Sequence, residues 1–236
     1  MWSFFAKNRI KKFLINKSLI KRTSLDGISI DLTNKQITKE IRRHIAKDTY
    51  EVEERSLLQK YLKSTDRVLE LGSGMGLVTS ICARNSAETT SIEANPDLIH
   101  IVQENLDFNG LSATVMHGAA STKDGVSEFH IAPQFWSSST IDRGNSKTIS
   151  IPSIDVNRII RENDVNVLVV DIEGGEDELL RNTCLSQIEK ICVEIHPSVL
   201  GKTAASELVG YIIAHGYTID FNKFDQVFFF ERITQA

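Results

Sequence analysis

The chain has 236 residues, of which 41% are hydrophobic, so it is long enough for one well-buried α/β domain with an N-terminal extension but too short for two full domains. Its net charge of -4 at pH 7 excludes a general attraction to nucleic acid. No run of about 18 uninterrupted apolar residues occurs, which excludes a membrane-spanning helix.

The first 22 residues form a basic segment with seven Lys or Arg and no Asp or Glu, so the other 214 residues carry a net charge of -11. Aromatic and basic residues between Met1 and Ile15 are compatible with a short basic amphipathic helix, a kind of segment that can lie on an anionic membrane surface. A solvated lid or an oligomer contact is the other interpretation. The segment is not a signal peptide, because charges repeatedly interrupt its apolar residues.

Cys82, Cys184 and Cys192 share no CxxC spacing, which argues against a zinc site. A free thiol in an apolar or mixed sequence behaves as a small hydrophobic side chain, so we expect all three in or near the core. Free thiols indicate a reducing compartment. We therefore expect a cytoplasmic protein, with peripheral membrane contact through residues 1–22 left open.

Apolar residues recur at nearly helical intervals over residues 36–62 and predict a helical cap over a pocket. The basic segment and this cap form an N-terminal part, residues 1–62, and the main domain spans residues 63–236. Strands and helices then alternate. The predicted strands are 68–71, 89–93, 113–116, 167–171 and 191–195, and the predicted helices are 77–84, 96–109, 154–162, 176–181 and 204–215. Two closing strands, 217–221 and 226–231, are joined by a short turn at 222–225 and favour a mostly parallel seven-stranded sheet with an antiparallel last strand.

One segment interrupts this alternation. Residues 126–131 alternate in polarity, as in a half-exposed antiparallel strand. Residues 132–147 are rich in Ser, Gly, Asn and Pro and predict a surface loop anchored by Trp136. A loop of this size is often a functional lid, so it is a candidate for substrate recognition. In the other interpretation Trp136 only packs beneath the loop.

The most informative run is Val68–Gly76, in which a buried strand ends in Gly72, Gly74 and Gly76. Closely spaced glycines let the backbone turn sharply and approach a ligand at the start of the next helix. Glu93 closes the second strand, 17 residues after Gly76, and is placed to accept hydrogen bonds from both hydroxyls of a ribose. These features predict a nucleotide-type pocket.

Two details favour S-adenosylmethionine over a dinucleotide in this pocket. The glycine spacing is GxGxG, whereas the dinucleotide fingerprint is GxGxxG. Glu70, two residues before the first glycine, would repel a pyrophosphate but suits the sulfonium and ammonium groups of S-adenosylmethionine, directly or through water.

An ordered set of motifs over roughly residues 45–232 resembles the FkbM-type methyltransferases. The motifs are Tyr50-Glu51 with Glu54, Glu70–Gly76, Asp155, Asp171–Glu176 and Val193–Pro197. The resemblance implies a Rossmann-like methyltransferase fold and methyl transfer, usually to a hydroxyl oxygen of a sugar, polyketide or related metabolite. It alone assigns Tyr50 to the cofactor rim. With the glycine-loop argument, the candidate cofactor-binding residues are Tyr50, Glu70, Gly72, Ser73, Gly74, Gly76, Glu93, Ala94, Gly118, Ala119 and Asp171.

Two positions depart from the family pattern. Gly175 stands where the family more often has alanine. The sequence His117-Gly118-Ala119 offers no acid for the adenine amine, so we expect backbone groups there to hold the adenine.

In an open α/β sheet, ligands lie beyond the carboxyl ends of the strands. Residues two apart in an extended segment point the same way, so we expect Asp171 and Glu173 to form a pair at this edge. Glu194 and His196 form a second pair by the same argument. An alcohol is a poor nucleophile and needs a general base, so the candidate catalytic residues are His196, Asp171 and Glu173. A His196 that only bonds the turn at Pro197 is the alternative.

The remaining expectations concern partners. The carboxylates permit a divalent metal ion such as magnesium, but no spacing requires one, and we assign no metal ligands. Glu176 is expected to stabilise the start of its own helix. We expect a small-molecule acceptor, with carbohydrate as one class, and no nucleic acid. Two rival functions stay open: a membrane-surface binding or assembly protein that retains the fold without turnover, and a nicotinamide-dependent oxidoreductase, which Glu70 disfavours.

Overall fold

The computed structural model of the chain describes residues 12–15, 17, 19–132, 138–141, 146–221 and 226–233. Three sequence predictions concern residues outside these ranges: most of the basic N-terminal segment, the anchor Trp136, and the turn at 222–225. Within the described ranges, none of the helices combines the length and the apolar character needed to cross a membrane.

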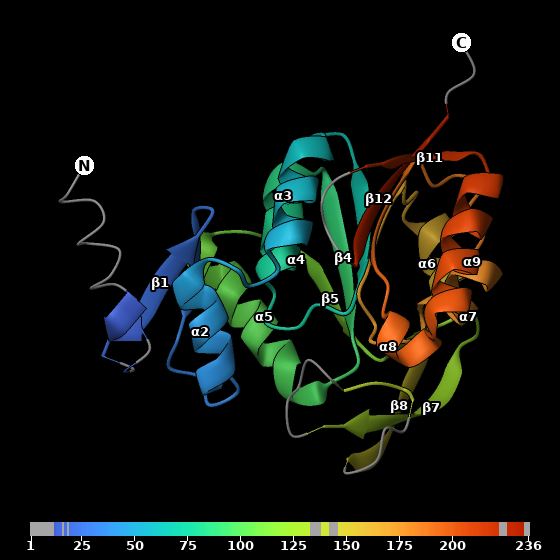
Figure 1. Ribbon diagram of the computed structural model, residues 1–236. Helices are drawn as coiled ribbons and strands as arrows, with labels where there is room; N and C mark the ends of the chain where they lie inside the picture. The colour runs from blue at the N-terminus through green and yellow to red at the C-terminus, as the bar shows by residue number, and fades with distance from the viewer. Residues whose placement is uncertain are drawn as a thin grey trace.

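A seven-stranded sheet runs through the centre of the described part of the molecule (Figure 1). In spatial order its strands are β11 (Tyr217–Asp220), β12 (Val227–Arg232), β10 (Lys190–Glu194), β9 (Val167–Val170), β3 (Arg67–Leu71), β4 (Glu88–Glu93) and β5 (Thr114–His117). The last strand, β12, pairs antiparallel with β10 and β11, and the other pairs are parallel. The prediction of a Rossmann-like, mostly parallel sheet with an antiparallel last strand is confirmed.

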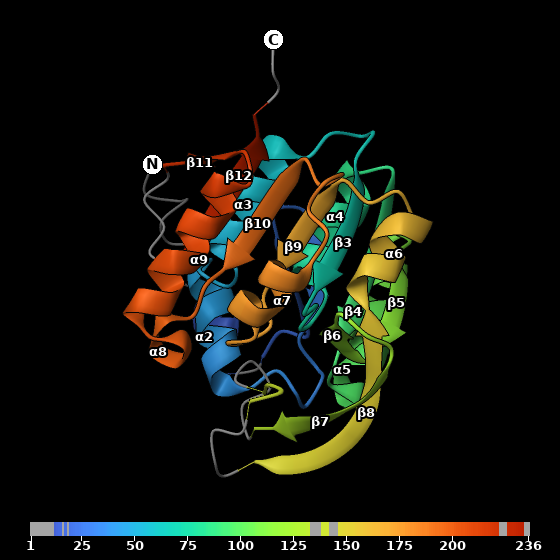
Figure 2. The same ribbon diagram turned by 90° about the vertical axis from the view of Figure 1, so that its right-hand side faces the viewer.

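Helices cover both faces of this sheet, as Figure 2 shows. One face packs against α3 (Val52–Tyr61), α4 (Leu77–Asn85) and α5 (Pro96–Asn109), and α2 (Lys39–Lys47) contributes to the same core beside them. The other packs against α6 (Val156–Glu162), α7 (Glu176–Asn182) and α9 (Lys202–Ala214), and the short α8 (Pro197–Leu200) precedes α9. In β9, Val167 and Val169 belong to the first core and Leu168 and Val170 to the second. Burial on both faces explains why this strand is continuously apolar.

The helix predicted over residues 36–62 is two helices. Asp48 (φ 62°) ends α2, and its backbone N–H bonds to carbonyls of that helix, while Glu51 (φ 47°) precedes α3. Left-handed backbone at these two positions breaks the helix, and Tyr50 lies in the break. This break positions both Tyr50 and Glu51, which line the pocket described below.

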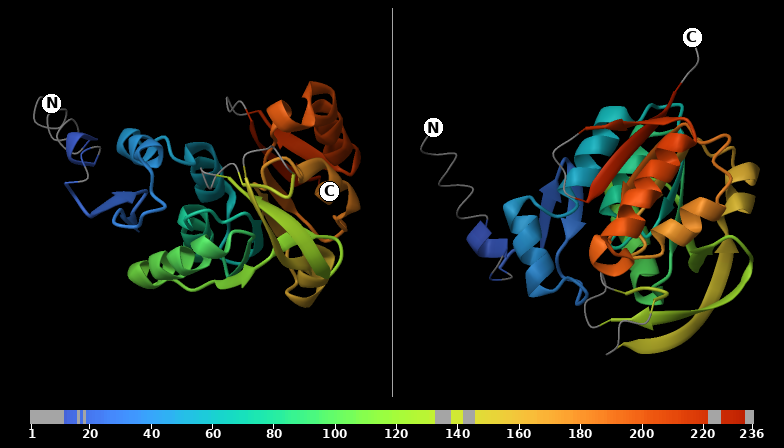
Figure 3. Two further views of the ribbon diagram at one scale, coloured as in Figure 1. Left: turned by 90° about the horizontal axis from the view of Figure 1, so that it is seen from below. Right: turned by 45° about the vertical axis from the view of Figure 1, so that its right-hand side comes forward.

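A β-hairpin that the sequence analysis missed precedes these helices. It consists of β1 (Arg22–Leu25) and β2 (Ile28–Asp31), which pair antiparallel, and Figure 3 shows it at one end of the molecule, away from α9. The turn is Asp26-Gly27, with φ of 49° and 79°. An Asp-Gly pair between apolar residues is a strong hairpin signal, so the sequence did contain the information.

A second, three-stranded sheet lies beside the carboxyl ends of the main strands (Figures 1 and 2). It comprises β6 (Ala119–Ser121), β7 (Gly125–Ile131) and β8 (Lys147–Asp155), with β7 antiparallel to β8, as predicted for residues 126–131. The predicted start of the next helix at Ile154 is wrong. The strand β8 continues through Pro152 to Asp155, and Asp155 then caps α6 by accepting a hydrogen bond from the Asn157 N–H.

The three thiols are free, and Cys82 and Cys192 are buried as expected. The prediction for Cys184 is wrong, because its side chain is exposed. It follows α7, and its backbone N–H bonds to Asn157 Oδ1, so the main chain is held while the thiol faces outward.

Candidate functional site

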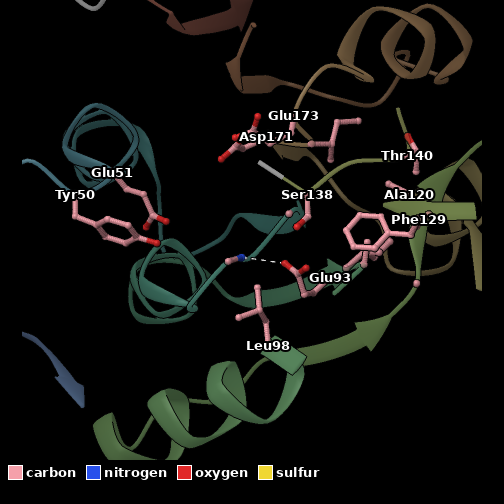
Figure 4. Close-up of a pocket in the computed structure, with 17 residues that line it drawn as sticks. Tyr50, Glu51, Glu93, Leu98, Ala120, Phe129, Ser138, Thr140, Asp171 and Glu173 are labelled. Carbon is pink, nitrogen blue, oxygen red and sulfur yellow. Dashed lines mark hydrogen bonds between the residues drawn. The ribbon is translucent and has the colours of Figure 1, made fainter. Parts of the chain in front are cut away.

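A pocket opens at the carboxyl edge of the main sheet, beside the ends of β3, β4 and β9 (Figure 4). It contains about 770 Å³ of space, open solvent at its mouth included. The predicted site residues that line it are Tyr50, Gly72, Gly74, Glu93, Ala94, Gly118, Ala119, Asp171 and Glu173. The fold therefore brings together groups from the helical cap, the glycine loop and three parallel strands.

Four predicted site residues, Glu70, Ser73, Gly76 and His196, do not line this pocket. Ser73 and Gly76 support the glycine loop. The Ser73 N–H donates to Glu93, and Gly76 (φ 81°) precedes α4, where a Cβ would lie 2.9 Å from the Val102 side chain. Glu70 and His196 lie deeper and are described below.

The apolar side of the pocket was not predicted. It is formed by Ile92, Leu98, Ala120, Phe129 and Ile172. Such residues look like ordinary core residues in a sequence, so no signal separates them. Ser138 and Thr140 also line the pocket and belong to the loop 132–147 that was a candidate for substrate recognition. Figure 4 shows Phe129 and Thr140 on the side opposite Tyr50 and Glu51.

The first glycine of the loop allows two strands to meet. Gly72 has φ 88°, and a Cβ built on it would lie 1.8 Å from the carbonyl oxygen of Asp171. Its N–H donates to the carbonyl of Ile92 at 2.9 Å, which ties the loop to β4. Only glycine combines this φ with this close approach, so Gly72 sets the distance between the loop and the Asp171 backbone.

Glu93 holds the glycine loop in place. Its Oε2 accepts the N–H groups of Ser73 and Gly74, both at 3.0 Å, and its Oε1 accepts the N–H of Asn95 at 2.7 Å. Figure 4 shows one of the bonds between the carboxylate and the loop. Burial raises the pKa of Glu93 above its usual value, and the N–H groups of Asn95, Gly74 and Ser73 act against that shift. The carboxylate is therefore a preorganised acceptor at the pocket wall.

Glu70 lies beneath the pocket. It is fully buried on β3, and its Oε2 accepts a hydrogen bond from the hydroxyl of Thr79 at 2.5 Å. Burial raises the pKa of Glu70 to about 7, the hydroxyls of Thr79 and Ser91 lower it, and the charge of Glu93 adds to the rise. The carboxyl group is thus part of the core under the loop.

Replacing this acid with its amide should flatten the pH dependence of stability. The pKa of Glu70 rises from 4.5 to about 7 on folding, so the fold favours the protonated form and loses stability as the pH rises from about 4.5 to about 7. This shift corresponds to ~3 kcal/mol of unfolding free energy. In urea unfolding, Glu70→Gln should gain stability relative to wild type at about pH 8 but not at about pH 4.5. An equal difference at both pH values would contradict a buried, protonated carboxyl.

Tyr50 and Glu51 form the cap side of the pocket. Burial raises the pKa of Tyr50 well above its usual value, and the charge of Glu51 raises it further. Burial and the charge of Glu54 likewise raise the pKa of Glu51, whose Oε2 is buried without a hydrogen-bond partner. The left-handed backbone of Glu51 is a strained conformation for a residue with a side chain.

A cluster of acids surrounds His196 at the ends of β9 and β10. Its Nε2 lies 3.6 Å from Glu173 Oε2, 3.7 Å from Glu194 Oε1 and 3.9 Å from Asp171 Oδ1, and its Nδ1 lies 2.7 Å from Glu176 Oε1. Both predicted pairs meet, but Asp171 and Glu173 do not meet by strand alternation. The strand β9 ends at Val170, and Glu173 has φ 58°, so a turn brings it beside Asp171.

These groups shift one another's protonation. Burial and then the charges of Glu194 and Glu173 raise the pKa of Asp171 well above its usual value, although 36% of its side chain is exposed at the mouth. Burial lowers the pKa of His196, but the hydrogen bond to Glu176 and the charge of Glu173 more than offset this, so it is raised overall.

A second, more open hollow adjoins the first and shares Glu51 with it. Its lining includes Glu53, Glu54 and Glu194. Burial, followed by the charge of Glu194, raises the pKa of Glu54 to about 8. The acidic character of the site thus continues along the cap.

The acidic side chains of the main pocket can carry charge of one sign only. Glu51, Glu93, Asp171 and Glu173 line it, and none of the described residues that line it is Lys or Arg. Carboxylates at a partly buried wall favour a cationic ligand and disfavour an anionic one. The pocket therefore suits a ligand that carries positive charge and an apolar or aromatic portion.

Comparison with known families gives one match. A family model described as the methyltransferase FkbM domain matches residues 75–219, which is more than half of the chain. The comparison with curated proteins finds no match.

Solved structures similar to the chain include an rRNA methylase from Streptococcus thermophilus (TM-score 0.48, 9% identity, 77% of this chain and 95% of that chain). Precorrin-6y C5,15-methyltransferase from Geobacter metallireducens has TM-score 0.48 and 11% identity over 77% of this chain and 89% of that chain. TYW2 of M. jannaschii, in complex with AdoMet, has TM-score 0.45 and 13% identity over 90% of this chain and 86% of that chain. At these TM-scores the likenesses carry no argument about function.

Proposed function

The chain belongs to the FkbM methyltransferase family, and from this premise we propose that it transfers a methyl group to a hydroxyl oxygen of a sugar-containing or other small metabolite. The methyl donor is S-adenosylmethionine, which supplies an electrophilic methyl group on a sulfonium. The hydroxyl nucleophile and the small acceptor are what we propose.

One observation carries the proposal: four carboxylates and no described Lys or Arg line a single pocket at the glycine loop. Such a wall stabilises a sulfonium and an ammonium group, and it repels the pyrophosphate of a dinucleotide. It also repels the phosphates of a nucleic acid, which supports a small acceptor without phosphate groups.

Two sets of pocket residues are assigned to the adenosyl part of the cofactor. We assign the ribose to Glu93, and specifically to Oε1, because Oε2 already accepts two backbone N–H groups. We assign the adenine to the backbone of Gly118 and Ala119, with Leu98 and Phe129 on the apolar side of the pocket. A narrow apolar wall excludes water from the face of an aromatic base.

Asp171 is the group that we assign to the acceptor hydroxyl. It lines the pocket, unlike His196, and its side chain reaches the mouth. A carboxylate there orients the hydroxyl and takes its proton, which is worth about 10²- to 10⁴-fold in rate. Glu173 lies beside it and supplies a second acceptor for a neighbouring hydroxyl.

A labelling experiment tests this function. The full chain is incubated with S-adenosylmethionine that carries a deuterated methyl group and a panel of glycosides, polyols and, for comparison, RNA. We expect a label on a hydroxyl oxygen of a small molecule. The rate of labelling in Asp171→Asn should be at least about 10²-fold lower than in the wild type. The matched control is Asp177→Asn, which alters an acid on α7 that pairs with Arg181. Label on nitrogen, on carbon or on RNA, read by mass spectrometry, would contradict the proposal.

A further inference from the structure

Three potential metal ligands converge beside the pocket. A carboxylate oxygen of Asp171, one of Glu173 and a ring nitrogen of His196 all lie within 4.8 Å of one another. Asp171 and Glu173 follow β9, and His196 follows β10, so neighbouring parallel strands deliver them to the same edge. The arrangement combines two oxygen donors and one imidazole.

Glu176 orients the imidazole. Its Oε1 accepts the backbone N–H of Gly174 at 2.8 Å and lies 2.7 Å from His196 Nδ1, and the side chain of Glu176 is fully buried. Because a carboxylate only accepts hydrogen bonds, Nδ1 carries the hydrogen and Nε2 faces the other acids. A histidine that binds a metal through one nitrogen typically donates its other N–H to a carboxylate in this way.

The groups facing Nε2 need a positive charge between them. The His196 side chain is nine-tenths buried, and the contacts of its Nε2 with the described residues are carboxylate oxygens at 3.6 to 3.9 Å. Asp171 Oδ1 is buried without a hydrogen-bond partner and is one of those oxygens. A buried carboxylate oxygen without a hydrogen-bond partner that faces an imidazole nitrogen indicates a missing partner.

We propose that Asp171, Glu173 and His196 bind one divalent metal ion through Oδ1, Oε2 and Nε2. Hard divalent ions lie about 2.0 to 2.6 Å from their ligands, which puts neighbouring ligands roughly 3 to 4 Å apart and opposite ligands roughly 4 to 5 Å apart. The separations of 3.6 and 3.9 Å, with none above 4.8 Å, match this range. Two carboxylates with one imidazole suit Mn²⁺ or Fe²⁺ better than Mg²⁺, because imidazole is a softer ligand.

Such an ion leaves coordination positions for water or for the acceptor hydroxyl. It uses one oxygen of Asp171 and leaves Oδ2 for the proton of the hydroxyl. The metal site thus deepens the proposed function, since it names a group that binds the acceptor oxygen. Metal binding is nevertheless measured without cofactor or acceptor, so its failure and the failure of methyl transfer are distinguishable.

Titration of the chelator-treated full chain with Mn²⁺, followed by electron paramagnetic resonance, tests the site. We expect one Mn²⁺ per chain and ¹⁴N coupling to its signal from the imidazole. Glu173→Gln and His196→Gln should weaken binding at least about tenfold, and Glu176→Gln by about 10- to 100-fold through the orientation of the ring. The matched control is Glu51→Gln, which removes a pocket carboxyl outside the ligand set and should change the affinity by less than about threefold.

The nitrogen coupling is read on the wild-type chain and does not depend on whether a variant folds. Absence of Mn²⁺ binding would overturn the proposal and leave a proton on Nε2 as the charge that holds the acids together. Binding without nitrogen coupling, or an equal loss in Glu51→Gln, would also overturn it, because the ion would then be held by general acidity rather than by this ligand set.

Discussion

Gly72→Ala should unfold the protein or lower its free energy of unfolding by roughly 3 kcal/mol or more. This is the largest effect on stability that we expect of any substitution in this fold. The alanine Cβ would lie 1.8 Å from the Asp171 carbonyl oxygen, and φ 88° is unfavourable for any residue with a side chain. The obstacle is main chain, so no side chain can rotate away. Relief would require the loop to separate from β9, which displaces both ends of the pocket. Denaturant unfolding measures the loss.

The matched control is Gly210→Ala. Gly210 lies in α9, and a Cβ there meets nothing within 4 Å. Alanine is the better helix former, so this substitution should raise the free energy of unfolding by about 0.5 to 1 kcal/mol. A lower free energy of unfolding in Gly72→Ala and a higher one in Gly210→Ala would support the close approach of the loop to β9. A Gly72→Ala protein as stable as wild type would contradict it.

Glu93→Gln should weaken the binding of S-adenosylmethionine and of S-adenosylhomocysteine at least about tenfold. Both carboxylate oxygens accept backbone N–H groups, from Ser73 and Gly74 at one oxygen and from Asn95 at the other. A glutamine places an NH₂ group against one of these donors, whichever way the amide turns. The loop must then shift, and the ribose loses its charged acceptor. Isothermal titration calorimetry gives the change in affinity.

Glu88→Gln is the control for this effect. It makes the same substitution on the same strand, but Glu88 is 43% exposed and pairs with Arg67 outside the pocket. A surface ion pair contributes little, so affinity should stay within about twofold of wild type. Undiminished affinity in Glu93→Gln would reject the ribose assignment, whereas an equal loss in both variants would point to a general effect on the fold.

The fold was largely predictable because its elements carry strong local signals. The run over 167–170 has no polar residue, as burial of β9 between two helical layers requires. Asn95 and Pro96 mark the start of α5, and Gly110 (φ 64°) marks its end. Not every signal was used: the hairpin of β1 and β2 was missed, although Asp26-Gly27 is a strong signal for it. The helix predicted from residue 154 begins later, because Ile154 lies inside β8, whose pairing with β7 is a long-range contact.

The site was predictable where a strand end supplies a residue directly. Glu93 ends β4 and Asp171 follows β9, and both line the pocket. The contact between Glu176 and His196 was not predictable, because it depends on how α7 packs against the end of β10. For the same reason, the sequence suggested that Glu70 contacts the ligand, whereas its position on the inward face of β3 places it in the core.

Calorimetric titration of the intact chain with S-adenosylmethionine and, separately, with NADH tests most directly whether the acid-lined pocket selects a cationic adenosyl compound. The pocket geometry predicts a Kd of about 1 to 100 μM for S-adenosylmethionine and binding of NADH at least about 100-fold weaker, because its pyrophosphate would face four carboxylates. NADH that binds as tightly as S-adenosylmethionine, or a chain that binds neither, would contradict the account.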